Sequence, residues 1–241
     1  MSHSEDEPLR RHRRALAWAV LLLALGAAAA AMVGRHPTEL APVTTLPAIG
    51  RADAAVERTV QDLRVVPFTW LAMALSVLGG GLVTIPLRIG AIAVLAVRRR
   101  WLRLTGFALA WLAAEASLLI LKPWFHRGRP PEPLVDTVGF SFPSGHALGV
   151  ATTTVALVLA FLPAGPRRRR WEWIAVAYAF TMSISRVYLG AHWFSDVVVG
   201  TLLGAGLAIA LSAIAVEVRD LIFQAEHRPI PDDAEPETAD V

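Results

Sequence analysis

The stretch SRVYLGAHWFSD, at residues 185–196, joins two apolar segments and contains Arg186, His192 and Asp196. It predicts two helices that meet at a polar turn. On a helix, His192 and Asp196 would be four residues apart and share a face. The carboxylate could then keep one imidazole nitrogen protonated and leave the other free to attack, as in a catalytic triad. A lone histidine could equally be an interfacial side chain, but a carboxylate heading an apolar helix is costly in lipid unless paired. His192 is the obvious partner.

Two further segments also lie at the ends of apolar stretches: KPWFHRGRP at residues 122–130 and PSGH at residues 143–146. Lys122 and Arg129 taken alone could be interfacial anchors. Ser144 alone could be a helix N-cap, although a helix start also binds anions, so the two roles are compatible. Leaving aside the residues between Lys122 and Arg129, the three segments supply three cations, two histidines and one carboxylate. This set is suited to binding a phosphoryl group and attacking its phosphorus.

The three blocks K-x6-RP, PSGH and SR-x5-H-x3-D resemble the type 2 phosphatidic acid phosphatase superfamily, the integral-membrane lipid phosphatases related to vanadium haloperoxidases. All three occur in order without a substitution, and the resemblance covers about residues 67–216. It implies that His192 is the nucleophile that forms a phosphohistidine, that Asp196 orients it, and that His146 protonates the leaving oxygen. It also implies a phosphate-binding set and no metal or other cofactor. That set consists of Lys122, Arg129, Ser144, the Gly145 amide and Arg186.

The composition is typical of a polytopic membrane protein. The 241 residues are 55% hydrophobic, with a mean hydropathy of +0.50. The chain has no cysteine, which excludes a disulfide framework, a thiolate metal site and a cysteine nucleophile. The formal net charge of +3 does not indicate a nucleic-acid partner. The expected partners are a lipid phosphate substrate and the bilayer itself, and nothing in the sequence indicates an oligomeric state.

We expect one all-α membrane domain, a bundle of six transmembrane helices. Residues 15–34 are predicted to be the first of these, with a cleaved signal peptide as the alternative. Residues 67–97 are apolar but interrupted by Gly79-Gly80-Gly81, and they predict a single broken crossing. The other four crossings are predicted at residues 102–121, 145–162, 171–184 and 196–216. The last five crossings make up the phosphatase membrane domain at 67–216. The parts outside the crossings are a basic N-terminus at 1–14, a loop at 35–66 and a mostly disordered tail at 217–241.

The loop at 35–66 contains apolar residues at helical spacing, which predicts a short amphipathic helix lying on the membrane. A solvated linker is the alternative. Its expected apolar face consists of Ile49, Val56, Val60 and Leu63. Its expected polar face consists of Arg51, Asp53, Glu57, Arg58, Asp62 and Arg64.

Arginine clusters predict the orientation. They occur at residues 10–14, 98–103 and 167–170, and six crossings place all three on one side of the membrane. The positive-inside rule makes that side cytoplasmic. Both termini are then cytoplasmic, and all three motifs face outward from a plasma membrane.

Three other features carry expectations. Glu115 lies inside a predicted crossing, and an intramembrane acid is a functional candidate by default, with Arg88 as a guessed partner. Gly200-xxx-Gly204 predicts a helix-packing or dimer face. His126 and Arg127 lie in the variable stretch of the first motif, where they could touch substrate, although the family pattern does not require them.

The sequence therefore predicts a metal-independent membrane phosphatase. The expected substrate is a lipid phosphomonoester or diphosphate. A polyprenyl diphosphate such as the undecaprenyl carrier of cell-wall synthesis is favoured over phosphatidic acid or phosphatidylglycerophosphate, because spent carrier is released on the outer side. The alternatives are a lipid phosphotransferase that uses the same phosphoenzyme, a non-enzymatic lipid transporter or scaffold, and, ranked low, a haloperoxidase.

Overall fold

The structure, a computed structural model, describes residues 6–33 and 48–226, with the side chains of 14–33 and 48–223. Within these ranges the chain is helical and has no strand, which confirms the predicted all-α fold. The described helices are α1 (Asp6–Val33), α2 (Ala48–Asp62), α3 (Val66–Gly79), α4 (Gly81–Val97), α5 (Trp101–Phe125), α6 (Gly145–Phe161), α7 (Pro166–Tyr188) and α8 (Phe194–Glu226).

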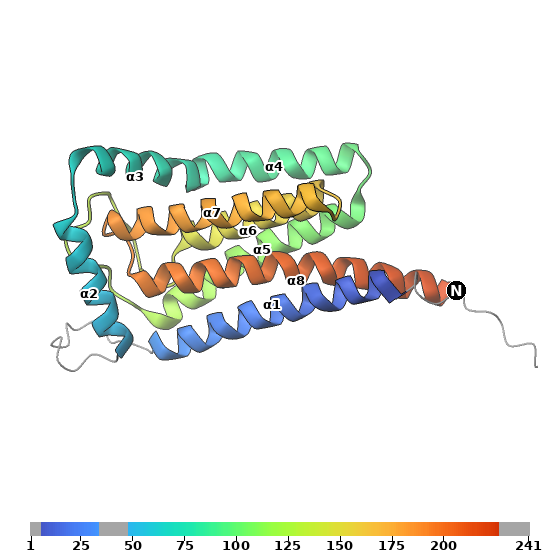
Figure 1. The fold of residues 1–241 in the computed structure, drawn as a ribbon, viewed down its shortest axis with the longest axis horizontal. Coiled ribbons are helices and arrows are strands. Elements are labelled where there is room, and N and C mark those ends of the chain that lie inside the picture. Colours follow the sequence, from blue (N-terminus) through green and yellow to red (C-terminus); the bar gives the residue numbers. More distant parts are fainter. Residues whose placement is uncertain (1–5, 34–47, 227–241) are drawn as a thin grey trace, which may run out of the picture.

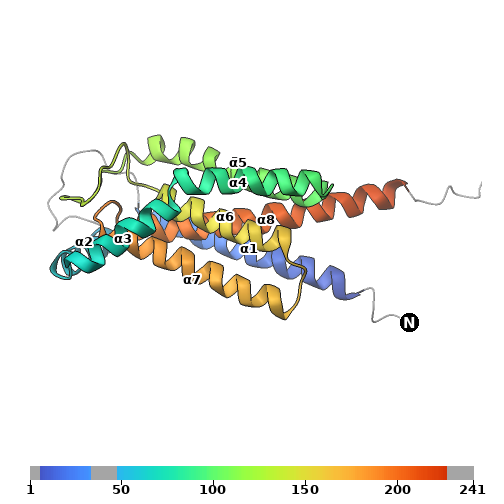
Figure 2. The ribbon, with the colours of Figure 1, turned by 90° about the horizontal axis from the view of Figure 1, so that it is seen from above.

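The helices form a bundle around α8. Six rods run along the long axis of the molecule (Figures 1 and 2). One rod consists of α3 and α4 end to end, and the others are α1, α5, α6, α7 and α8. α8 packs most extensively against α6, α1 and α5. α2 does not join this alignment but crosses one end of the bundle (Figure 1). α5, for example, buries only small and apolar side chains, as close packing of apolar helices requires.

Four described segments are long and apolar enough to cross a membrane: Arg14–Val33, Val66–Val97, Trp101–Phe125 and Phe194–Phe223. Val66–Val97 comprises α3 and α4, in agreement with one interrupted crossing. The interruption falls at Gly80, whose extended backbone ends one helix and precedes the next. α6 is apolar but has only 17 residues, and α7 begins with a run of arginines. The count of six crossings therefore stays a prediction.

Close packing between α6 and α8 depends on two glycines. A Cβ atom at Gly204 would lie 2.4 Å from the carbonyl oxygen of Leu148, and one at Gly200 would lie 2.8 Å from that of Ser144. Both distances are far below van der Waals contact, so only glycine lets the two backbones approach this closely. The Gly200-xxx-Gly204 face is thus a packing face within the chain.

α2 differs from the expected amphipathic helix in which residues it buries. Val56 and Val60 of the expected apolar face pack against the protein core, whereas Leu63 is 60% exposed. Asp53 and Glu57, expected on the polar side, are buried. The reason is that both carboxylates meet arginines of the protein, Asp53 through Arg127 and Glu57 through Arg64. α2 therefore packs on α7 and α8.

The C-terminal boundary also differs from the prediction. The tail was expected from residue 217, but α8 continues to Glu226. Residues 217–226 are therefore helical, and the remainder of the predicted tail, 227–241, lies outside the described residues. Residues 34–47 of the predicted loop and residues 1–5 of the N-terminus lie outside them as well.

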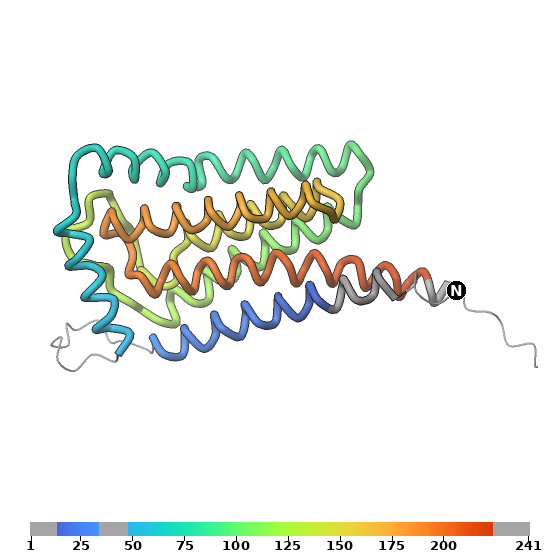
Figure 3. The backbone as a smooth tube through the Cα atoms, viewed as in Figure 1, coloured from blue at the N-terminus to red at the C-terminus, as the bar shows by residue number. Residues whose placement is uncertain are grey.

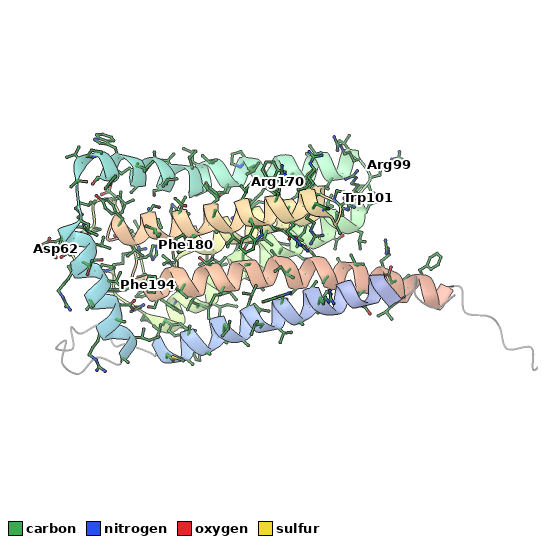
Figure 4. All side chains as sticks on the ribbon, viewed as in Figure 1. Asp62, Arg99, Trp101, Arg170, Phe180 and Phe194 are labelled. Carbon is green, nitrogen blue, oxygen red and sulfur yellow. The ribbon has the colours of Figure 1, made fainter. Side chains whose placement is uncertain are left out.

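The two ends of the bundle have different chemistry. The backbone trace shows that the α5–α6 loop and the α7–α8 turn lie at the same end as α2 (Figure 3). Phe194, next to the third motif, and Asp62 of α2 lie toward this end, whereas Arg99 and Arg170 lie at the other (Figure 4). The motif segments are thus gathered at the end opposite two of the arginine clusters.

Candidate active site

Helix termini bring the sequence-predicted residues together at the α2 end of the bundle. Lys122 lies in the last turn of α5, and Arg129 lies in the loop that follows. Ser144 caps α6, whose first turn holds Gly145 and His146. Three more predicted residues complete the set from the third motif: Arg186 in the last turn of α7, His192 in the turn to α8, and Asp196 in the first turn of α8.

His192 lies between an acid and an arginine. Its Nδ1 atom is 3.6 Å from Oδ2 of Asp196, slightly beyond hydrogen-bonding distance, and its Nε2 atom is 3.5 Å from an Arg129 nitrogen. The Trp193 amide donates to the same Asp196 oxygen at 3.0 Å. Catalytic hydrogen bonds are often long without substrate and shorten in the reacting complex. The arrangement directs Nδ1 to the carboxylate and Nε2 to the cationic side of the site.

The environment of His192 favours the neutral imidazole. Its pKa is lowered from 6.5 to about 4, chiefly because burial penalises the charged ring. Asp196 acts in the opposite direction, and the charges of Arg129 and Arg186 lower the pKa further. At neutral pH the ring is therefore uncharged and has a lone pair, as a nitrogen nucleophile requires.

Backbone carbonyls, not carboxylates, hold the cations of the first motif. Arg129 donates to the carbonyl oxygens of Gly139 at 2.9 Å and Ala191 at 2.6 Å. Lys122 donates to the Phe140 carbonyl at 2.6 Å, and Arg129 reaches the same oxygen at 3.3 Å. Because a carbonyl carries no net charge, these contacts do not neutralise either side chain, and both stay available to bind an anion.

Arg186 and His146 meet at α3. Arg186 donates a hydrogen bond to the Ser76 hydroxyl, and His146 lies close to the same residue. The Arg186 Nε atom is buried without a partner, so one donor of this guanidinium is unsatisfied. Among the described residues, none of Lys122, Arg129 and Arg186 forms a salt bridge with a carboxylate. Three uncompensated cations beside two histidines form a strongly anion-attracting site.

Ser144 ties two helix starts together. Its hydroxyl accepts a hydrogen bond from the Ala147 amide at 3.4 Å, as an N-cap does, and its own amide donates to the Asp196 carbonyl at 3.1 Å. The side chain is fully buried. The start of α6, which carries Gly145 and His146, is thereby fixed against the start of α8.

The sequence did not reveal the buried residues that hold Asp196 on the side away from His192. Arg127 donates to Asp196 at 2.5 Å and to Asp53 of α2 at 2.6 Å, and its side chain is buried. The possibility that Arg127 contacts substrate is therefore not favoured, because both ends of its guanidinium are taken by carboxylates. The only available signal was an extra arginine inside the first motif, and nothing in the sequence linked it to position 53.

No group of three or more His, Asp or Glu side chains in the described part of the chain is arranged to hold a metal ion.

Comparison with known proteins agrees with the geometry. Residues 103–220 match the family model of the PAP2 superfamily. A decaprenylphosphoryl-5-phosphoribose phosphatase from Mycobacterium tuberculosis is 34% identical over 131 residues, which cover 52% of this chain and 67% of that protein. This chain belongs to the PAP2 superfamily. The PAP2 region contains all three motifs and excludes α2.

Two other proteins are similar to this chain over different lengths. An undecaprenyl-diphosphatase from Sulfolobus acidocaldarius is 43% identical over 70 residues, only 29% of this chain and 31% of that protein. The crystal structure of a transmembrane PAP2 type phosphatidylglycerolphosphate phosphatase from Bacillus subtilis superposes with a TM-score of 0.70 at 26% identity. It covers 83% of this chain and 96% of the other. The chain therefore spans about a third of the first of these proteins and nearly all of the solved one.

Proposed function

We propose that this protein is a membrane phosphatase that hydrolyses a lipid phosphomonoester or diphosphate. The observation that carries the proposal is the neutral, buried His192, set between Asp196 and a group of cations that no carboxylate neutralises. Relatives named as lipid phosphatases support the same class of reaction.

The first step would transfer the phosphoryl group to the protein. Lys122, Arg129 and Arg186 bind the phosphate oxygens, with help from Ser144 and the Gly145 amide, and offset charge in the transition state. Asp196 keeps the proton on Nδ1 of His192, so the Nε2 lone pair attacks phosphorus. The N–P bond forms as the bond from phosphorus to the leaving oxygen breaks. His146, which carries the extra proton while the anionic substrate is bound, gives that proton to the leaving oxygen and becomes neutral, and the lipid product leaves.

The second step would regenerate the enzyme. A water molecule loses a proton to His146 and attacks phosphorus, and the P–N bond to His192 breaks. Inorganic phosphate is released, and His192 returns to its neutral form. A diphosphate substrate yields a lipid monophosphate and inorganic phosphate by the same two steps. No metal ion is needed for either step, because side-chain cations provide the charge stabilisation.

We favour a polyprenyl diphosphate as the substrate, followed by phosphatidic acid and phosphatidylglycerophosphate. The support is twofold. Two of the relatives act, by name, on polyprenyl-linked substrates. The site also lies at the end of the bundle opposite Arg99 and Arg170 (Figure 4), which the positive-inside rule makes the outer end in a plasma membrane with both termini cytoplasmic. Spent carrier lipid of cell-wall synthesis is released there.

The test is phosphate release by purified full-length protein in detergent. The panel contains a polyprenyl diphosphate, phosphatidic acid and phosphatidylglycerophosphate, each with excess chelator. His192→Asn is compared with His126→Asn, a change of the same type at an exposed histidine of the neighbouring loop. We expect chelator-resistant release that H192N abolishes and H126N retains, and the ranking identifies the substrate class. Loss of free phosphate on adding an acceptor would instead indicate transfer.

A further inference from the structure

Four buried polar side chains form a connected cluster on the side of Asp196 away from His192. Arg127 lies at its centre and donates to Asp196 Oδ1 at 2.5 Å and to Asp53 Oδ2 at 2.6 Å. Ser195 donates to Asp53 twice, from its amide at 2.8 Å and from its hydroxyl at 2.6 Å. The Arg127 guanidinium also donates to the Ser195 hydroxyl at 2.7 Å. The cluster thus joins α2, the α5–α6 loop and α8.

The cluster is sealed from water, which makes its geometry demanding. Asp53 is 2% exposed, Arg127 is 7% exposed and Asp196 is fully buried. Charges in such a setting interact strongly, but they are tolerated only when each is paired and hydrogen-bonded. Asp53 meets this condition with three donors. A carboxylate on the exposed face of an amphipathic helix would need none of these three donors. Asp53 is therefore an integral member of the buried cluster.

The contacts divide the Asp196 carboxylate between two tasks. Its Oδ1 atom accepts from Arg127, while its Oδ2 atom faces His192 and accepts from the Trp193 amide. Arg127 therefore fixes the rotation of the carboxylate that faces the imidazole. Arginine has a long, flexible side chain, and Asp53 holds the other end of this guanidinium. The Trp193 ring lies 5.6 Å from it and restricts it further.

We propose that Asp53, on α2, is a positioning residue for phosphoryl transfer: through Arg127 it holds Asp196, and thereby His192, in the attacking orientation. The inference rests on the proposed phosphatase function. It extends the site beyond residues 103–220, the part that matches the superfamily. A helix that crosses the end of the bundle would then complete the catalytic pair rather than merely cover it.

Two other roles for this cluster predict different behaviour. If Asp53 only anchored α2, its loss would lower stability and leave the turnover of folded enzyme unchanged. If Arg127 bound the substrate phosphate, weakening its hold would raise KM. A positioning role acts on kcat with little change in KM, because Asp53 touches none of the phosphate-binding residues and alters only the orientation of the nucleophile.

The first experiment compares Asp53→Asn with Asp62→Asn in purified full-length protein. Both remove one carboxylate from α2, but Asp62 is exposed at the end of that helix (Figure 4). We expect D53N to lower kcat by about 10- to 100-fold, the range known for groups that orient a metal-bound histidine, with KM within about twofold. D62N should match the wild type in both constants.

A double-mutant cycle tests whether Asp53 acts through Arg127. The variants are D53N, Arg127→Gln and the two combined. If Asp53 acts only through Arg127, adding D53N to R127Q changes kcat by less than about twofold, because the link is already broken. Multiplying effects would show that Asp53 acts independently and would overturn the proposal.

Ser195→Ala provides a second route if D53N protein does not accumulate. It removes a hydroxyl that donates to Asp53 and accepts from Arg127, and it should lower kcat about threefold or more at unchanged KM. Unchanged kcat in D53N or S195A beside an active wild type would overturn this inference alone. A wild type that releases no phosphate from any substrate would overturn the proposed function, and this inference with it.

Discussion

Replacing Gly204 with alanine tests the account of how the helices position the site. The added Cβ would lie 2.4 Å from the Leu148 carbonyl oxygen and 2.9 Å from Thr152 Oγ1. Ordinary contact begins near 3.4 Å, so the first distance is about 1 Å too short. The obstructing atom belongs to the backbone of α6 and cannot rotate away. α6 or α8 must therefore move as a whole.

The expected cost follows from this geometry. Overpacking a close interior contact costs about 1–3 kcal/mol, and a backbone obstruction places Gly204→Ala near the upper end. For a chain of this size, about 3 kcal/mol corresponds to a fall in melting temperature of roughly 6–12 °C. Because α6 carries His146 in its first turn, the displacement should also lower kcat.

The assay is thermal unfolding in detergent, with phosphate release measured on the same samples. Gly90→Ala is the matched control, since Gly90 is a helical glycine whose added Cβ would meet nothing within 4 Å. We expect G90A to melt at or slightly above the wild-type temperature, because alanine favours helix. Equal melting temperatures for G204A and wild type would refute the packing argument. A change of oligomeric mass alone would assign the glycine face to a dimer.

Three further predictions concern charged groups. Asp196→Asn should lower kcat about 10³- to 10⁴-fold at similar KM, measured by steady-state phosphate release, because an amide that donates to Nδ1 selects the wrong tautomer of His192. The acid limb of kcat/KM should lie near pH 4 rather than 6.5, because the lowered pKa of His192 keeps the ring neutral down to that pH. Measuring the profile with two substrates of different phosphate pKa distinguishes ionisation of His192 from ionisation of the substrate. Glu115→Gln should lower the melting temperature by several degrees, because it leaves the buried Arg88 without the carboxylate now 2.8 Å away.

Most of the site could be predicted from the sequence because its residues lie in three short motifs. His192 and Asp196 are four residues apart, and Ser144 directly precedes the helix it caps, so local spacing placed both. Each segment also follows or precedes an apolar run, which located the motifs at helix ends. The broken crossing at residues 67–97 was predicted on similar grounds, since three consecutive glycines interrupt a helix.

The contacts between Asp53, Arg127 and Asp196 could not be predicted in the same way. Positions 53 and 127 are far apart in the chain, and their pairing depends on how α2 crosses the end of the bundle. Helical periodicity assigned Asp53 to the polar face of α2, which is correct for an isolated helix. It failed here because a buried arginine makes the interior favourable for that carboxylate. Burial of Glu57 against Arg64 has the same cause.

The ion pair between Glu115 and Arg88 could be predicted only in part. Glu115 and Arg88 were each conspicuous in apolar segments, and the structure joins them at 2.8 Å. Arg88 also donates to Thr153 at 2.7 Å and to the Gly149 carbonyl at 3.0 Å. Chemistry alone suggested the ion pair, because a charge in lipid requires a partner. The α6 partners of Arg88 required the three-dimensional packing.

The central claim is that His192 carries the phosphoryl group, and rapid-quench labelling tests it directly. Wild-type protein is mixed with substrate labelled in the transferred phosphate, quenched in alkali, where phosphohistidine survives, and digested for mass spectrometry beside His192→Asn. We predict an acid-labile phosphoryl group on His192 of the wild type, and neither label nor phosphate release in the variant. A label on another residue, or phosphate release that persists in H192N, would contradict the account.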